Sequence, residues 1–266
     1  MTAVAVDRAK TEEAILDVTA QLTELLRAGA NTAAVLPRSN WTVAQAASHL
    51  VIAGRFFCEL AAGADAFYAE GTREALAQAN ASKLEAFTEH DGAALADHLD
   101  EVTRTFLTAA AGHPGSRQVT TPMGRMDLDT LRSYLLAHSM IHGYPLAKAV
   151  GRTLRIPGGY VALALPFLTS AMLTVVDAPH VGGLNASYLI HLRGGPRLAV
   201  AFDHGALRVN EPARRVDCHI SADPLAFFLV AMGLQSQWAA IARGKMMAWG
   251  TKPWLAFRLV AYFAVP

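Results

Sequence analysis

In the first 150 residues, apolar side chains recur with the spacing of amphipathic helices. Residues 9–29 predict a first helix with one apolar side, formed by Ile15, Val18, Leu22, Leu25 and Leu26. A second helix begins after Thr42, whose hydroxyl can cap its first turn, and it loses its pattern at Gly63.

Two further helical regions complete the predicted bundle. Residues 72–112 have helical spacing, interrupted near residues 90–92 by His, Asp and Gly. The sequence QVTTPMGRMDL then alternates like a strand around a Met-Gly turn. A last helix opens at Asp129 or Thr130 and runs to about residue 150.

Beyond residue 184 the repeat shortens to two residues, which is typical of strands with one buried face. Four short segments alternate in this way and end in Gly, Pro, Asn or Asp: SYLIHLRG, RLAVAFDHG, ALRVNEP and RVDCHISAD. We expect an antiparallel sheet. Two helical stretches follow, over residues 224–244 and 252–263, with KMMAWG between them as one more strand. The second half is therefore predicted to be α+β.

The length of 266 residues and the change of period predict two domains. We expect a helical bundle at residues 1–155 and an α+β domain at residues 156–266. The segment 156–176 is uncharged and close to the length that spans a bilayer. Pro157, Pro166 and the absence of a flanking basic cluster favour a buried helix of a soluble protein over a membrane span.

The composition narrows the possible partners. Hydrophobic residues make up 53% of the chain and charged residues 17%, and the formal net charge is +1. Without an excess of positive charge, we expect neither nucleic acid nor a membrane surface as a partner. The N-terminus reaches charged residues too early for a secretory signal. Cys58 and Cys218 each lie in an apolar stretch, which argues against disulfides and thiolate zinc sites and favours a cytoplasmic protein.

His138 and His142 are four residues apart on the predicted last helix, so both project from one side, about one turn apart. Such a pair can chelate one metal ion. Helical projection puts apolar residues on the same side, among them Leu131, Tyr134, Leu135 and Ile141. It places four other residues away from this face: Arg132, Ser133, Ser139 and Gly143.

His49 faces inward on the second helix, beside Ala46, Ala53 and Phe56. Three inward imidazoles need partners, because a buried ring without one has an unfavourable desolvation energy. A shared, zinc-like metal would satisfy all three. Alternatively, each is a core histidine that bonds to a hydroxyl or a backbone carbonyl. Spacing alone leaves both interpretations open.

The segment WTVAQAASHL, together with HSMIHGYPLAKAVGR from His138 onward, resembles the N-terminal domain of the mycothiol-dependent maleylpyruvate isomerases, within the DinB-like superfamily. The resemblance implies a four-helix bundle in which His49, His138 and His142 bind a divalent metal, usually zinc. The isomerase branch commonly has Glu at the position of His138 and Asp at that of Pro145, whereas the broader superfamily often uses three histidines. This departure affects the expected activity more than the expected metal binding.

The second half resembles the sterol-carrier-protein fold with which these isomerases end, a small sheet with helices and an apolar tunnel. DCHISADPLAFFLVAMG followed by ARGKMMAWGTKPWLAFRL reproduces its final strand, helix, strand and helix. The resemblance therefore covers nearly the whole chain.

Kinship with this family implies that the metal activates the thiol of mycothiol, which then attacks a small electrophilic substrate. The reaction would be an isomerisation or an S-transfer. Two alternatives stay open. One is a non-catalytic protein that binds a hydrophobic ligand in its C-terminal domain, and the other is a thiol-independent, metal-dependent cyclase, lyase or hydrolase.

Two residues are candidates for catalysis on the substrate side. Tyr134, one turn before His138, could donate to a metal-bound ligand, or it could be a packed core tyrosine. Arg243, with Lys245, could bind a substrate carboxylate, or it could be a solvated surface residue. We expect both cysteines to be inert. We place four residues near the C-terminus in the core: Met246, Met247, Trp249 and Trp254.

Overall fold

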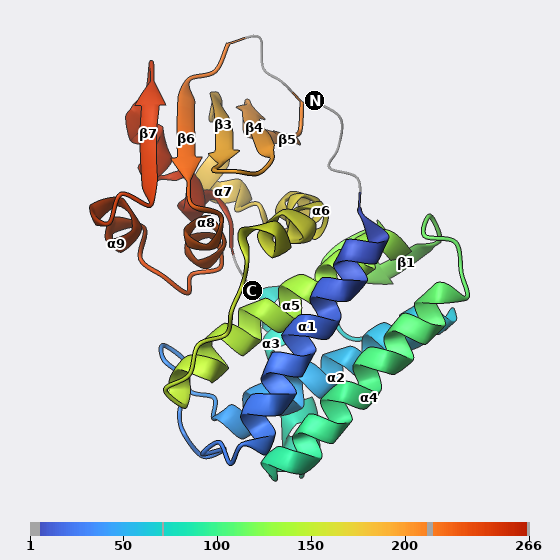
Figure 1. Cartoon of the computed structure of the whole chain (residues 1–266). Helices are drawn as coiled ribbons and strands as arrows, with labels where there is room; N and C mark the ends of the chain where they lie inside the picture. Colours follow the sequence, from blue (N-terminus) through green and yellow to red (C-terminus); the bar gives the residue numbers. More distant parts are fainter. Residues whose placement is uncertain (1–5, 71, 212–214, 265–266) are drawn as a thin grey trace. The chain divides into compact units, whose positions relative to one another are not determined.

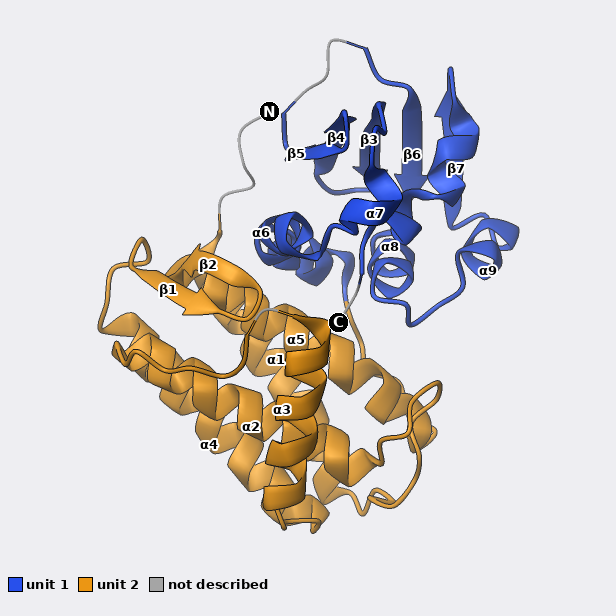
Figure 2. Cartoon of the chain, turned by 180° about the vertical axis from the view of Figure 1, so that it is seen from behind, with its two compact units in different colours: residues 1–5, 157–266 blue, residues 6–156 orange. Residues whose placement is uncertain are grey.

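The computed structural model describes residues 6–70, 72–211 and 215–264 (Figure 1). The chain divides into two compact units, one formed by Val6–Ile156 and the other containing the chain from Pro157 onward (Figure 2). The first is a helical bundle and the second combines helices with a five-stranded sheet, which confirms the predicted fold class.

Four long helices build the first unit: α1 (Arg8–Arg27), α2 (Val43–Ala62), α4 (Gly92–Ala111) and α5 (Leu128–Ala149). Both α1 and α2 pack against α4 and α5 (Figure 1). A hairpin of β1 (Gln118–Thr121) and β2 (Gly124–Asp127) precedes α5. Helix α3 (Arg73–Ala86) contacts α2 but buries none of its own residues, so it lies outside the four-helix core.

Side-chain caps set where two helices begin. Thr42 accepts a hydrogen bond from the Gln45 backbone N–H at 3.2 Å, and the Gln45 side chain accepts one from the Thr42 N–H at 2.9 Å, which confirms the predicted start of α2. Helix α5 is capped by Asp127, whose carboxylate accepts from the Thr130 N–H at 2.7 Å. It therefore begins at Leu128, slightly earlier than we predicted.

The bundle core follows the predicted apolar stripes on α1 and α2. Ile15, Val18 and Leu22 of α1 are fully buried. Helix α2 lies close to α4 because Gly54 has no side chain: a Cβ there would be 2.8 Å from the Val102 Cγ2 atom. This close packing fixes α2, the helix that carries His49.

Helix α5 is buried on more sides than its sequence predicts. The four residues predicted to lie away from the histidine face, Arg132, Ser133, Ser139 and Gly143, are buried as well. Helical projection assumes one buried face, whereas α5 contacts α1, α2 and the β1–β2 hairpin together. The helix continues through Pro145 to Ala149.

Arg132 is the largest fully buried side chain of the described chain. Its Nε donates to the Glu12 carboxylate at 2.8 Å and its Nη1 to the Asp129 carboxylate at 3.0 Å. Its Nη2 donates to the Ala110 carbonyl at 2.9 Å. The guanidinium thus ties α1, α4 and α5 together at one point, with hydrogen bonds from all three of its nitrogens.

The second unit is built around a sheet with strand order β5-β4-β3-β6-β7. Its strands are β3 (Ala186–Leu192), β4 (Arg197–Asp203), β5 (Ala206–Val209), β6 (Cys218–Ala222) and β7 (Met246–Gly250). All neighbours are antiparallel except β3 and β6, which are parallel. The expectation of a wholly antiparallel sheet is wrong at this pair. Alternation determines which face of the sheet a side chain lies on, but it does not determine the direction of the strand. Strand β6 begins at Cys218, which pairs with Tyr188 near the beginning of β3.

Helices complete the unit: α6 (Gly158–Val175), α7 (Ala178–Val181), α8 (Pro224–Ala231) and α9 (Gln237–Ala242). The predicted helix over 224–244 is split into α8 and α9 because Gly233 takes a left-handed conformation, with φ of +67°. The predicted helix over 252–263 is instead two short 3₁₀ helices, Pro253–Phe257 and Leu259–Tyr262.

Exposure corrects the predicted core of this unit. Met247, Trp249 and Trp254 are 58%, 45% and 57% exposed, so placing them in the core is wrong. Strand β7 lies at one edge of the sheet, where apolar side chains need not be covered.

Helix α6 is long and apolar enough to cross a membrane, judged by length and composition alone. Within its unit it packs against α8, and 39% of its residues are buried. Its assignment to a soluble core stays a prediction.

Candidate metal centre

The three predicted histidines meet between two packed helices. His49 lies on α2, and His138 and His142 lie one turn apart on α5. Each offers a ring nitrogen, and these nitrogens lie within 4.8 Å of one another. The Nε2 atoms of His49 and His138 are 3.1 Å apart. Sequence positions separated by 89 residues thus converge on one point, as the metal-site interpretation requires.

Aromatic rings enclose the cluster. The ring of Trp41 lies 4.9 Å from that of His49 and 5.9 Å from that of His142, measured between centroids. The rings of Phe57 and Tyr134 lie 5.8 Å and 6.1 Å from that of His138. These apolar walls exclude water from most of the site.

Burial keeps the imidazoles uncharged. The side chains of His49 and His138 are 5% and 7% exposed, while His142 is partly exposed. Burial lowers the pKa of His49 to about 4. Burial, and then the neighbouring imidazoles, lower the pKa of His138 and of His142 well below the ordinary value. All three rings are therefore neutral at pH 7, the form in which histidine binds a metal.

The donor set fits a divalent metal better than it fits ordinary core histidines. The Nδ1 atoms of His49 and His138 are buried and have no hydrogen-bond partner among the described residues. Neither ring bonds to a hydroxyl or a backbone carbonyl, which is what the core interpretation needs. Three neutral nitrogen donors suit zinc and leave a fourth coordination position for another ligand.

Tyr134 lies where the sequence placed it, on the inner side of α5. Its ring packs at 4.8 Å from that of Phe57 and edge-on to His138. Burial, and then Tyr68, raise the pKa of its hydroxyl, which therefore stays protonated and able to donate. Its catalytic role stays a prediction.

The second candidate for substrate binding lies in the other unit. Arg243 is exposed and caps the C-terminal end of α9. Lys245 forms an ion pair with Asp223 at 3.9 Å, which gives it a structural role there. The proposed role of Arg243 stays a prediction.

Neither cysteine is suited to act as a nucleophile. The Cys58 thiol donates to the Val102 carbonyl at 3.2 Å, and burial, with Glu59, raises its pKa to about 11. Burial also raises the pKa of Cys218. Both thiols are therefore protonated at neutral pH, in agreement with the expectation that they are inert.

Two aromatic residues that line the site, Trp41 and Phe57, were not among the residues predicted from the sequence. Trp41 opens the segment that carries the family resemblance, and Phe57 is eight residues after His49. The helical spacing of Phe57 relative to His49 is a signal that could have placed it near the cluster. Trp41 precedes α2, so its position depends on how the chain enters the helix.

Comparisons with known proteins agree with the overall fold. The chain is similar to a crystal structure of the mycothiol-dependent maleylpyruvate isomerase, with 14% identity and a TM-score of 0.56 over 89% of this chain and 94% of that chain. A histidine-to-alanine mutant of that isomerase gives 13% identity and a TM-score of 0.55 over 88% and 93%. At these identities the similarity establishes a common fold. No curated protein matches the chain.

Residues 13–143 match the family model described as the mycothiol maleylpyruvate isomerase N-terminal domain. This range contains His49, His138 and His142 together with the aromatic walls around them. The domain that holds the three histidines therefore belongs to the mycothiol maleylpyruvate isomerase N-terminal domain family.

Proposed function

We propose that the chain is an enzyme that uses zinc, held by His49, His138 and His142, and a low-molecular-weight thiol, mycothiol, to act on a small electrophilic substrate. The reaction is an isomerisation or an S-transfer. The observation that carries this proposal is the convergence of three neutral imidazoles, two of which, His49 and His138, are buried with an Nδ1 atom that has no partner in the described chain. Membership of the family supports the use of mycothiol as the thiol co-substrate.

When bound, a divalent ion lowers the pKa of a coordinated thiol, so that thiolate is present at neutral pH. The imidazoles carry no negative charge and leave the charge of the ion undiminished. The nucleophile is external because Cys58 and Cys218 are protonated. Addition of sulfur to an electrophilic double bond permits rotation, and elimination of the same thiol then gives the isomer. If the carbon next to the new C–S bond is instead protonated, the sulfur stays on carbon and the product is a thioether.

The surrounding side chains prepare the site for such a reaction. Trp41 and Phe57 shield the histidines from water, which strengthens electrostatic interactions inside. The ring of Tyr134 packs edge-on to that of His138, and its protonated hydroxyl is the group to which we assign hydrogen-bond donation to a substrate oxygen. His142 is the most exposed of the three ligands, so access from solvent is on its side.

Metal content tests the centre. We expect protein purified without added metal to contain about one zinc per chain by elemental analysis, and His138→Ala to lose it. His98→Ala is the matched control, because His98 lies on α4 and pairs with Glu101 at 3.8 Å, away from the cluster. Full-length protein that folds but contains no zinc would contradict the proposal.

Turnover with and without mycothiol tests the thiol. Maleylpyruvate reports isomerisation, and 1-chloro-2,4-dinitrobenzene reports S-transfer. We expect a rate that depends on mycothiol with at least one of them and that His138→Ala abolishes. A metal-dependent rate that is equal without the thiol would instead favour a cyclase, lyase or hydrolase.

A further inference from the structure

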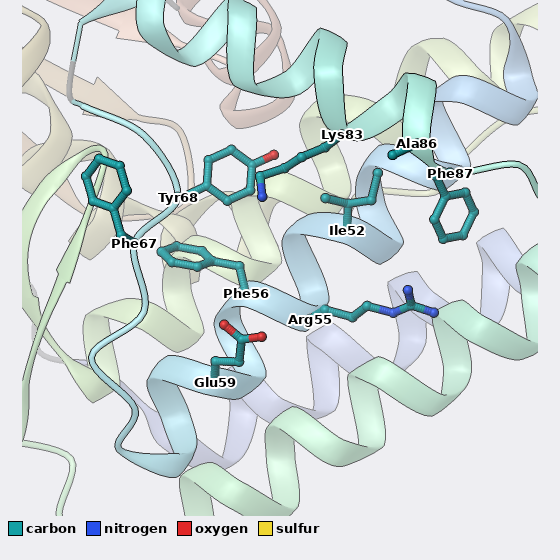
Figure 3. A pocket seen from close by; sticks show the side chains of 9 residues that line it. All are labelled: Ile52, Arg55, Phe56, Glu59, Phe67, Tyr68, Lys83, Ala86 and Phe87. Carbon is teal, nitrogen blue, oxygen red and sulfur yellow. The ribbon is translucent and has the colours of Figure 1, made fainter.

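A second site lies on the same bundle, between α2, α3 and the segment that joins them (Figure 3). It is a cavity of about 320 Å³, which is the size of a pocket for a small molecule. Helix α2 contributes Arg55, Phe56 and Glu59, while Tyr68 comes from the joining segment and Lys83 from α3. No residue of α3 is fully buried, so the side of α3 that faces this cavity is only partly covered.

The cavity has aromatic walls. Phe56 is buried, and its ring meets that of Tyr68 edge-on at 5.1 Å. The Tyr68 hydroxyl donates to the Asn80 side-chain oxygen at 2.7 Å, which fixes the orientation of the ring. Burial raises the pKa of Tyr68 to about 12, so this donor stays in place at neutral pH. Rings held in this way favour a flat apolar molecule.

Two cations stand over rings at the cavity. The Lys83 Nζ atom lies 4.9 Å from the centre of the Tyr68 ring, and the Arg55 Cζ atom lies 5.4 Å from that of Phe87. In the described ranges, neither cation has a carboxylate within 4.0 Å. Two positive charges without an ionic partner beside a partly apolar cavity attract an anion.

Glu59 limits what that anion can be. It lines the same cavity four residues after Arg55, and no ion pair joins it to any described cation (Figure 3). Its carboxylate repels a ligand with a second negative charge. The lining charges sum to one positive charge, which suits a ligand with a single negative charge.

A row of rings links this cavity to the histidines. Phe56 lies 5.9 Å from Phe57, and Phe57 lies 4.8 Å from Tyr134, which contacts His138. The two sites therefore share helix α2 and one aromatic layer, but have no lining residue in common.

We propose that this cavity binds a small aromatic monocarboxylate, with its ring against Phe56 and Tyr68 and its carboxylate toward Lys83. Arg55, which extends toward Phe87 at the other end of the cavity, adds a second positive charge (Figure 3). The site is distinct from the histidine centre, and its binding does not require that the centre holds a metal.

Calorimetric titration of the full chain with 2-naphthoate tests this proposal. We expect Lys83→Met to weaken binding about tenfold, because a charge-assisted contact is lost. The matched control is Lys148→Met, since Lys148 also stands over a tyrosine ring, that of Tyr144 at 5.5 Å, but does not line the cavity. Replacing 2-naphthoate by the neutral 2-naphthalenemethanol should also weaken binding about tenfold.

Glu59→Gln gives a prediction of opposite sign. Removing this negative charge should tighten 2-naphthoate binding about threefold, by relieving a repulsion of about the strength of a surface ion pair. Arg55→Met supplies a second loss of charge if Lys83→Met fails to fold, as judged by circular dichroism. His138→Ala should bind 2-naphthoate like the wild type, which separates this site from the proposed metal chemistry.

No detectable binding of 2-naphthoate would overturn the proposal. Equal affinity for the acid and the alcohol would do the same. The proposal would also be overturned if Lys83→Met and Lys148→Met changed the affinity for 2-naphthoate equally, since that result would place the probe elsewhere on the chain.

Discussion

Helix α5 carries two clusters of buried polar groups that differ in whether their hydrogen bonds are satisfied. Arg132 is completely buried, yet each of its nitrogens donates to a carboxylate or a carbonyl. His138, nearly two turns further along, has only the ring of His49 as a hydrogen-bond partner in the described chain, and its Nδ1 atom has none.

This difference separates a structural cluster from a functional one. A buried charge with a full set of partners links the helices and loses stability when one partner is removed. Buried imidazoles without partners lower the stability of the metal-free chain, because their lost hydration is not replaced. This contrast supports the proposal that the histidines bind a ligand.

The largest effect on stability is expected at Arg132, whose hydrogen bonds are all satisfied. Arg132→Met should lower the free energy of unfolding by about 4 kcal/mol, because the carboxylates of Glu12 and Asp129 and the Ala110 carbonyl lose their donor. Urea unfolding measures the change. Arg104→Met is the control: its pair with Asp100 is largely exposed and should contribute less than about 1 kcal/mol. Similar losses in both variants would remove the distinction between buried and exposed pairs.

Zinc should stabilise the histidine cluster by binding the imidazoles that lack hydrogen-bond partners. At a free concentration about 100 times its Kd, zinc should raise the free energy of unfolding by about 2.7 kcal/mol. His138→Ala should lose this gain, whereas Arg132→Met and His98→Ala should keep it, even from a lower baseline. Thermal unfolding with zinc and with a chelator measures the difference. A gain that persists in His138→Ala would assign zinc to other residues.

Acid should separate the clusters by a margin that is smaller for each pH unit. The folded protein holds the pKa of His49 near 4, whereas the unfolded chain protonates it near 6.5. Below about pH 6.5 the unfolded state binds more protons, so stability falls as pH falls, by up to about 1.4 kcal/mol per pH unit for each such histidine. For His49 this loss ends near pH 4. Urea unfolding of metal-free protein across this range measures the slope.

His49→Leu provides the matched variant for this pH dependence. It should have a shallower slope, since one proton-binding group is lost, while Arg132→Met should keep the slope of the wild type. An unchanged slope in His49→Leu would mean that other groups govern the acid sensitivity.

The histidine site could be predicted because local periodicity determines most of it. The four-residue spacing of His138 and His142 places them on one side of a helix, and the apolar stripe around His49 places it inside. Helical projection gave no pairing between the two helices. That step rested on family resemblance, and the packing of α2 against α5 brings the rings together.

Arg132 could not be predicted in the same way. Its partners Glu12 and Ala110 are 120 and 22 residues distant in sequence, and a charged residue is normally placed on the solvent side. Only the packing of three helices around it creates the buried site. The parallel pairing of β3 with β6 is equally non-local, since alternation in each strand is the same for either direction.

That parallel pair also sets an order of assembly for the second unit. Antiparallel β3, β4 and β5 follow one another through short turns and can pair as soon as they are synthesised. Tyr188 meets Cys218 only after the intervening chain has closed a loop of about 30 residues. Until then one edge of β3, an apolar strand at the centre of the finished sheet, has unpaired backbone groups. We therefore expect the nascent chain to be most prone to aggregation in the interval before β6 joins.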